Sequence, residues 1–213
     1  MKRSLEIVVA TKNKKKLKEI KEILKDFNLR FLSLEDYPNS PRIIENGKTF
    51  KENAVKKAFK IAKFTKSLAL GEDSGLCVEA LGGGPGIYSS RFSGKPACRI
   101  GRNKSDQQNN LKLLRLLDGL PIKKRRAYYV CAVALADAKG LLAVVEGRCS
   151  GVIGFEFRGS HGFGYDPLFI IPKYKKTFAE LGERIKHKIS HRFRALEKTR
   201  KIIQKYIEKQ EVN

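Results

Sequence analysis

The stretch LEIVVATKNKKKLKEIKEIL, residues 5–24, indicates the fold class because its hydrophobic period changes partway along. It opens with the β-rich run Leu5–Ala10 and continues through the polar turn Thr11–Asn13. Apolar residues then recur at helical spacing from Leu17 to Leu24. A strand, a loop and a helix in this order are typical of the start of an α/β protein.

Apolar patterning further along predicts both helices and antiparallel strands. The expected elements are a strand at 29–34, a helix from Thr49, strands at 68–70 and 77–81, a helix at 106–117, a hairpin of strands 127–136 and 141–145, strands at 151–157 and 168–171, and a helix at 191–210. In the helix at 106–117, the expected buried stripe is Leu111, Leu114 and Leu117. We therefore expect an α/β fold with a mixed central sheet flanked by helices. Residues 1–213 are expected to form a single domain, with two lobes around a cleft.

The totals describe a strongly basic globular protein. Among 213 residues, 45 lysines and arginines face 22 aspartates and glutamates, which gives a formal net charge of +23. This charge implies an anionic partner: a nucleotide, a nucleic acid or an acidic surface. The first apolar run is short and interrupted by Glu6, and no stretch approaches the roughly 18 apolar residues that span a bilayer. We therefore expect a cytoplasmic protein with no membrane partner.

The four cysteines are Cys77, Cys98, Cys131 and Cys149, and no two lie close in sequence. Their spacing matches neither a zinc ribbon nor a dense disulfide framework. We expect reduced, mostly buried thiols.

An acidic island interrupts the basic chain. Residues 67–90 contain no lysine or arginine, and within them Gly71–Gly75 places Glu72 and Asp73 between glycines, after the apolar run Leu68–Leu70. The pattern predicts a strand leading into an acidic turn. Two adjacent carboxylates there suit a hard cation such as Mg²⁺, and a plain polar turn is the alternative.

Two polar clusters suit a phosphate chain. Residues 11–16 place lysines between a strand and a helix, where backbone N–H groups attract anions. A helix from Thr49 would carry Thr49, Asn53 and Lys57 on one face near Glu45. A solvated lysine run and an exposed polar face are the respective alternatives.

A glycine-rich segment, GSHG at 159–162, introduces Phe163–Pro167. The aromatic residues could stack on a base, and Asp166 could accept hydrogen bonds from ring N–H groups. Turn formation with core packing is the alternative.

Near the last predicted helix, Lys186, His191 and Arg192 offer donors for carbonyl or phosphate oxygens. His187 and His191 also stand at a metal-compatible spacing, but no zinc motif accompanies them.

Five segments together resemble the inosine/xanthosine triphosphate pyrophosphatase family, also called non-canonical purine NTP pyrophosphatases. In order they are VVATKNKKKLKEI, ENGKTFKENAVKKA, GEDSGLCVEALGGGPGIYSSRFSG, GFGYDPLF and ISHR. The resemblance implies a Mg²⁺-dependent hydrolase that converts ITP, dITP or XTP to the monophosphate and pyrophosphate. It also implies an elongated two-lobed fold, an active-site cleft between the lobes and a homodimer.

Site residues follow from the resemblance by position. Asp73 matches the catalytic carboxylate and a metal ligand, and Glu45 matches a second acidic metal residue. Glu72, also a candidate metal ligand, stands where aspartate is more usual, which leaves its direct role open. The implied substrate-binding residues are Thr11, Asn13, Lys16, Lys57, Ser74, Phe163, Gly164, Tyr165, Asp166, Lys186, His191 and Arg192. Lys12 and Lys15 stand where many relatives have glycine.

Two other classes compete with this interpretation. A nucleic-acid-binding module would explain the charge but not the acidic island, so we expect no nucleic-acid partner. A related hydrolase for pyrimidine or modified-base nucleotides would share the metal chemistry but leave Phe163, Asp166, Lys186 and His191 without a role.

Overall fold

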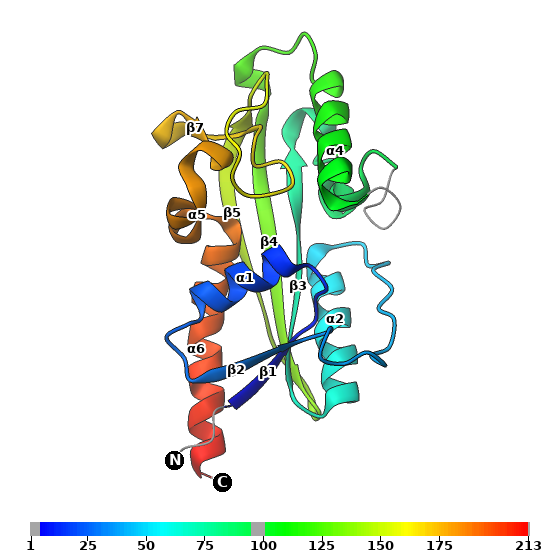
Figure 1. Ribbon diagram of the computed structural model, residues 1–213, viewed down its shortest axis with the longest axis vertical. Coiled ribbons are helices and arrows are strands. Elements are labelled where there is room, and N and C mark those ends of the chain that lie inside the picture. Colours follow the sequence, from blue (N-terminus) through cyan, green and yellow to red (C-terminus); the bar gives the residue numbers. More distant parts are fainter. Residues whose placement is uncertain (1–4, 95–100, 213) are drawn as a thin grey trace. The chain divides into compact units, whose positions relative to one another are not determined.

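The computed structural model describes residues 5–94 and 101–212 of the chain (Figure 1). Its strands are β1 (Leu5–Val9), β2 (Leu29–Ser33), β3 (Leu68–Val78), β4 (Arg126–Asp137), β5 (Gly140–Ile153), β6 (Phe169–Ile171) and β7 (Lys176–Thr177). Its α-helices are α1 (Lys14–Ile23), α2 (Phe50–Thr65), α4 (Arg102–Leu116), α5 (Phe178–Ile189) and α6 (His191–Val212). Short 3₁₀ helices are η1 (Glu79–Leu81), η2 (Gly86–Arg91), η3 (Ile122–Lys124) and η4 (Pro172–Tyr174).

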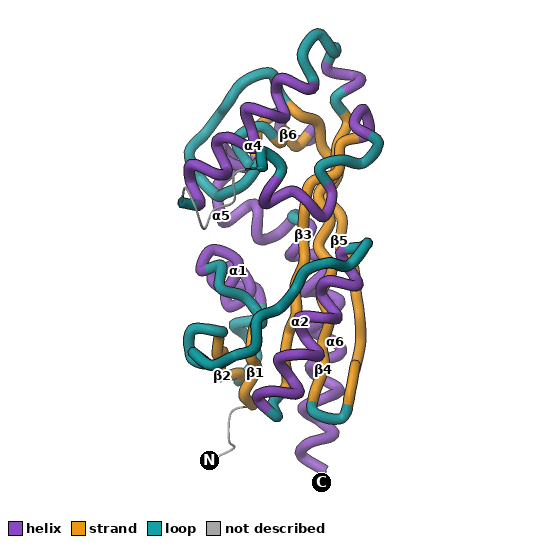
Figure 2. Tube along the Cα trace, turned by 90° about the vertical axis from the view of Figure 1, so that its right-hand side faces the viewer, coloured by secondary structure: helices purple, strands orange, loops and turns teal. Residues whose placement is uncertain are grey.

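The described strands form one seven-stranded sheet in the order β2-β1-β3-β4-β5-β6-β7. β1 pairs in parallel with both β2 and β3, whereas β6 pairs antiparallel with β5 and β7. β4 and β5 are joined by the tight turn at Ala138 and Lys139 that the hairpin prediction requires (Figure 2). The predicted mixed sheet flanked by helices is confirmed.

The described chain divides into two compact units. The first comprises residues 5–73, 131–147 and 191–212, and the second comprises residues 74–94, 101–130 and 148–190. The long strands β3, β4 and β5 therefore contribute residues to both units. The expectation of a single domain stays a prediction.

In the first unit, the alternation of strand side chains produces two separate cores. One face of the sheet carries residues such as Ile7, Leu70 and Val133, which pack with α1 and α6. The other face carries small residues such as Ala69 and Ala132, which pack with α2. Because consecutive residues point to opposite faces, each strand serves both cores at once.

The predicted acidic turn at 71–75 is wrong, because β3 runs without interruption through these residues. Gly71 does not serve a turn. A Cβ at this position would overlap the carbonyl oxygen of Ala54 and the amide of Ala58, both on α2. The absence of a side chain at Gly71 lets α2 lie directly against β3. The glycine that the sequence suggested for a turn is therefore needed for close packing.

The second unit has its own core, which includes Leu76, Tyr129, Phe169 and Phe178. Phe169 and Phe178 stack with ring centroids 5.4 Å apart.

Helix α4 covers this core with a different stripe from the predicted one. Leu113 and Leu117 are fully buried, whereas Leu111 is 38% exposed and Leu114 is partly buried. The helix starts earlier than expected, at Arg102.

Two further strand boundaries differ from the predictions, and one helix was not predicted. β3 ends at Val78 and the 3₁₀ helix η1 follows, where a strand to residue 81 was expected. β5 is continuous to Ile153, so the strands expected at 141–145 and 151–157 are one element that ends early. Helix α5 was not predicted at all, although Thr177 and Glu180 form a capping box at its start.

Cys77, Cys131 and Cys149 are buried, reduced cysteines, as expected, and Cys98 lies outside the described residues. Within residues 5–94 and 101–212, no helix is both long enough and apolar enough to cross a membrane.

Candidate active site

Strand β3 sends its two adjacent carboxylates to opposite faces of the sheet in the first unit. Glu72 continues the face of Leu70 and meets α1 and α6, while Asp73 continues the face of Gly71 and meets α2. Both side chains are buried, at 3% and 6% exposure. The acidic pair is therefore two sites, each with its own partners.

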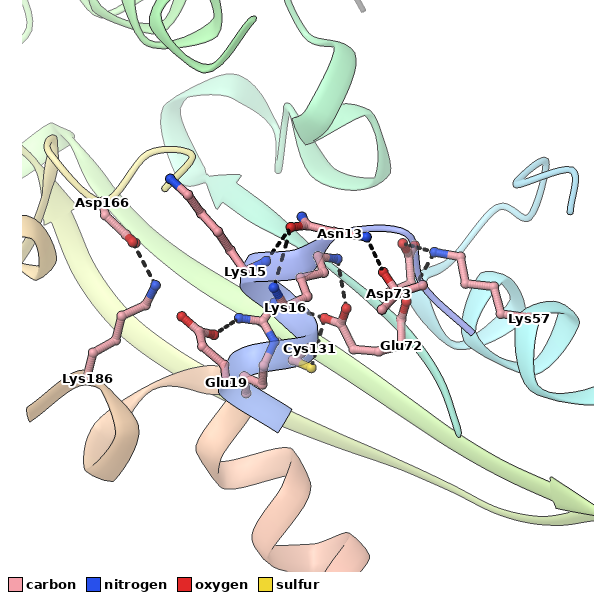
Figure 3. A network of polar contacts seen from close by, with 12 residues as sticks. Asn13, Lys15, Lys16, Glu19, Lys57, Glu72, Asp73, Cys131, Asp166 and Lys186 are labelled. Atoms are coloured by element: carbon pink, nitrogen blue, oxygen red, sulfur yellow. Dashed lines mark hydrogen bonds and ion pairs between the residues drawn. The ribbon is translucent and has the colours of Figure 1, made fainter. Parts of the chain in front are cut away.

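On the α2 face, Asp73 is held by two side chains one helical turn apart. Lys57 Nζ lies 3.0 Å from Asp73 Oδ1 (Figure 3). Asn53 Nδ2 donates to Asp73 Oδ2 at 3.1 Å. Lys57 Nζ also lies 2.9 Å from the half-exposed carboxylate of Glu45 and donates to the backbone oxygen of Glu72. The structure thus brings together Glu45, Asn53, Lys57 and Asp73, as the sequence suggested.

Two factors set the pKa values in this cluster: burial, and the sharing of the Lys57 ammonium group by Asp73 and Glu45. Burial raises the pKa of Asp73, and the nearby charges of Lys57 and Lys16 oppose that rise. Burial alone would lower the pKa of Lys57, but Asp73 and Glu45 raise it above its ordinary value. Lys57 therefore stays charged, whereas burial disfavours the ionised form of Asp73.

Thr49 has a different function from the predicted one. It is the N-cap of α2, and its hydroxyl accepts from the backbone N–H of Glu52. It thus starts the helix that presents Asn53 and Lys57.

On the opposite face, Glu72 is the centre of a buried charge network. Lys16 Nζ lies 2.7 Å from Glu72 Oε2, and Arg192 donates to Glu72 Oε1 at 3.1 Å. The Cys131 thiol donates to the same oxygen at 3.3 Å. Arg192 also pairs with Glu19 of α1, a residue that sequence reasoning missed.

The charges in this network fix its protonation states. Burial alone would lower the pKa of Arg192, but Glu72 and Glu19 raise it, so the guanidinium stays charged. Burial raises the pKa of Cys131 far above its usual range, and Glu72 adds to the rise, so the thiol stays protonated.

The lysine loop begins α1, and Asn13 is its N-cap. Asn13 Oδ1 accepts from the backbone N–H groups of Lys15 and Lys16, and Thr11 Oγ1 accepts from the Asn13 N–H. No acidic residue lies in the first turn, and Lys16 points back to Glu72 (Figure 3). A helix start rich in lysine and free of acidic residues favours an anion.

The donor chemistry of the first unit fits a divalent metal in part. Asp73 and Glu45 are oxygen donors that already share one cation, Lys57, and hard divalent cations take the same donors. Glu72 lies on the other face of β3. Accordingly, no group of three or more potential ligands gathers anywhere in the described residues.

In the second unit, Asp166 and Lys186 form a buried ion pair beside an aromatic ring. Lys186 Nζ lies 2.6 Å from Asp166 Oδ2 (Figure 3). It also lies 4.5 Å from the ring centroid of Phe163. Asp166 Oδ2 also accepts from the Phe163 N–H at 2.9 Å. Tyr165 is only 3% exposed, and its ring packs in the hydrophobic core of the second unit.

The predicted base-reading set is divided between the units. Phe163, Asp166 and Lys186 lie in the second, whereas His191 and Arg192 begin α6 in the first. The zinc alternative for His187 and His191 fails, because α5 and α6 are separate helices with extended backbone at Ser190 between them. Ser74 is half-buried in β3, next to Asp73.

Comparison with known protein families assigns this α/β chain to one of them. The model of the Ham1 family matches residues 7–202. The chain belongs to the Ham1 family.

Several relatives match over almost their whole length. The dITP/XTP pyrophosphatase of Desulforamulus reducens is 47% identical over 208 residues, covering 98% of this chain and 100% of that protein. The dITP/XTP pyrophosphatase of Shouchella clausii is 47% identical over 193 residues, covering 90% and 92%. The solved structure of a HAM1 protein from Coxiella burnetii is 38% identical with a TM-score of 0.82, covering 94% of this chain and 99% of that one.

Proposed function

We propose that this protein hydrolyses non-canonical purine nucleoside triphosphates, such as ITP, dITP and XTP, to the monophosphate and pyrophosphate. The observation that carries the proposal is the buried carboxylate Asp73, held by Lys57 and Asn53 in a chain 47% identical to a dITP/XTP pyrophosphatase. Removing such nucleotides from the cellular pool would be its role.

The charge clusters of the first unit suit the polyphosphate. Lys16 and Lys57 supply ammonium groups for phosphate oxygens, and Asn13 with the start of α1 adds backbone donors. A bound divalent cation, which we propose to be Mg²⁺ held by Asp73 and Glu45, would neutralise further phosphate charge. The Asp73 carboxylate would orient the water that attacks the α-phosphorus, and pyrophosphate would leave. Glu72 acts through Lys16, which it holds at 2.7 Å.

The second unit suits the purine base. Hypoxanthine and xanthine present a carbonyl acceptor at the 6-position, where adenine presents an amino donor. Lys186 offers a donor for that oxygen, and Phe163 offers a ring for stacking. A site built on such donors discriminates by roughly 10⁴-fold or more, because the wrong base leaves buried polar groups unpaired.

We further propose that the protein acts in the cytoplasm as a homodimer and that its anionic partner is a nucleotide rather than a nucleic acid. The buried carboxylates Glu19, Glu72 and Asp73 support the last point, since a nucleic-acid surface would not need them.

A substrate panel tests the proposal. Purified protein with Mg²⁺ should release pyrophosphate from ITP and XTP far faster than from ATP. A folded protein that releases no pyrophosphate from any triphosphate would refute the enzyme proposal. Equal rates on ITP and ATP would refute only the selectivity.

A further inference from the structure

The turn at Phe163–Asp166 in the second unit is tied to helix α4 through both backbone groups of one residue. The Gly164 N–H donates to Asp106 Oδ2 at 2.9 Å, and Asn110 Nδ2 donates to the Gly164 carbonyl oxygen at 2.8 Å. Asp106 and Asn110 lie four residues apart, so they share one face of α4. Neither residue was singled out by sequence reasoning.

The orientation of the Asn110 amide is determined by its partners. Its nitrogen donates to two carbonyl oxygens, those of Gly164 and Asp106, so only an N–H group can occupy that position. The side chain is almost fully buried, at 2% exposure. A carboxylate of the same shape would place an acceptor against an acceptor, away from water.

Gly164 makes the double attachment possible through its backbone conformation. Its φ is +64°, a left-handed value, while a Cβ at this position would meet no atom within 4 Å. The glycine is therefore required for the turn rather than for space.

Other contacts hold the turn from two sides. The Tyr165 hydroxyl donates to the Ser89 carbonyl oxygen at 2.8 Å. Toward α5, Asp166 pairs with Lys186, and its carbonyl oxygen accepts from the Ala179 N–H at 3.2 Å. Loss of the α4 contacts would thus leave the turn attached but free to shift.

We propose that Asp106 and Asn110 are positioning residues that set the base selectivity of the enzyme. They act by fixing the turn that carries Phe163 and Asp166, without touching the nucleotide. This inference rests on the proposed function, in which that turn reads the purine.

If this proposal is correct, loosening the turn should change substrate affinity and selectivity rather than the amount of active protein. A loosened turn misplaces the groups that contact the base, and misplacement of about 1 Å is costly in an enzyme site. The polyphosphate groups of the first unit stay unchanged, so the effect falls on KM for ITP and on the ratio of ITP to ATP hydrolysis. A merely structural role would lower the fraction of active protein and leave both values alone.

Four variants of the full chain test this. Asn110→Asp and Asp106→Ala break the attachment, and Asp106→Asn keeps an acceptor oxygen for the Gly164 N–H. Arg115→Gln, on the exposed side of α4, is the matched control. Each variant is measured for kcat and KM with ITP and ATP, for calorimetric binding of inosine and adenosine monophosphates, and for hydrogen exchange of the Gly164 amide.

We expect Asn110→Asp and Asp106→Ala to raise KM for ITP and weaken inosine monophosphate binding about tenfold. The Gly164 amide should exchange faster in Asp106→Ala, and Asp106→Asn should restore most of the affinity. Unchanged inosine monophosphate affinity and an unchanged ITP to ATP ratio in both breaking variants would overturn the proposal. Monophosphate binding and amide exchange need no turnover, so a wild-type protein without pyrophosphatase activity would refute the proposed function separately.

Discussion

The two units differ in how they hold their polar side chains. In the first, four carboxylates share three cations on both faces of β3: Glu19, Glu45, Glu72 and Asp73 with Lys16, Lys57 and Arg192. In the second, one buried ion pair, Asp166 with Lys186, lies beside an aromatic ring and a turn that is hydrogen-bonded to α4.

In the proposed function, this difference would correspond to the two parts of a nucleotide. A dense network of charge can exchange partners with a highly charged polyphosphate and a metal ion. A single fixed ion pair with a rigid turn suits a neutral, flat base that is recognised by hydrogen-bond pattern. The comparison predicts that changes in the first unit alter rate on every substrate, whereas changes in the second alter selectivity.

The largest effect is expected for Asp73→Asn. Loss of the carboxylate removes the proposed metal ligand and water-orienting group, so kcat/KM should fall about a thousandfold on ITP and ATP alike. Steady-state pyrophosphate release measures this. Glu22→Gln, on the exposed surface of α1, is the control, and a fully active Asp73→Asn would contradict the assigned role.

The next effect is expected for Lys186→Met, which leaves Asp166 buried without its cation. Removing one partner of a buried pair costs about 3–5 kcal/mol in stability. We expect kcat/KM on ITP to fall about a hundredfold, and on ATP far less. Lys188→Met on the same helix, with an exposed side chain, is the matched control. Equal losses on the two substrates would remove Lys186 from base recognition.

A smaller effect is expected for Gly71→Ala, which tests the packing of α2 against β3. The added methyl group overlaps the backbone of Ala54 and Ala58, which cannot move without the helix. The free energy of unfolding should fall by about 2 kcal/mol, measured by urea denaturation. Activity should also fall, because Asn53 and Lys57 move with α2. A variant of wild-type stability would refute the close-packing role of this glycine.

The smallest effect concerns stability and pH. Burial raises the pKa of Asp73, so the folded protein holds its proton more tightly than the unfolded chain does. Stability from such a group is complete below the ordinary value of 3.8 and is lost as the pH rises through the folded pKa. Lys57 would keep its ion pair with Glu45, at 2.9 Å, in the variant. Without divalent cation, Asp73→Asn should therefore have a higher free energy of unfolding than wild type at pH 7.

That advantage should shrink as the pH falls toward 4, because the wild-type carboxyl becomes protonated. Urea denaturation at both pH values measures the difference, and Asp118→Asn on the surface is the control. If the difference in free energy of unfolding between Asp73→Asn and wild type grew toward low pH, the folded state would favour the ionised carboxylate.

Much of the fold could be predicted because local patterns agree with it. The opening strand, loop and helix, the hairpin at residues 137–140 and the last helix all appear where apolar spacing placed them. The prediction of an acidic turn was wrong because glycine beside carboxylates is typical of turns. Gly71 is instead required by the packing of α2, a helix that precedes it in the sequence, against β3.

The candidate site shows the same limit. Asp73 and Lys57 were both candidate site residues in the sequence, and the fold pairs them. Glu19 could not be found, because its partner Arg192 is 173 residues away and contact between α1 and α6 creates the pair. Asp106 and Asn110 looked like ordinary polar residues of a helix until the fold placed Gly164 beside them.

One measurement tests the division of roles most directly: the ratio of kcat/KM for ITP to that for ATP, in wild type, Asp73→Asn and Lys186→Met. We predict that Asp73→Asn lowers both rates and preserves the ratio, and that Lys186→Met lowers the ratio by at least tenfold. A changed ratio in Asp73→Asn together with an unchanged ratio in Lys186→Met would contradict the account.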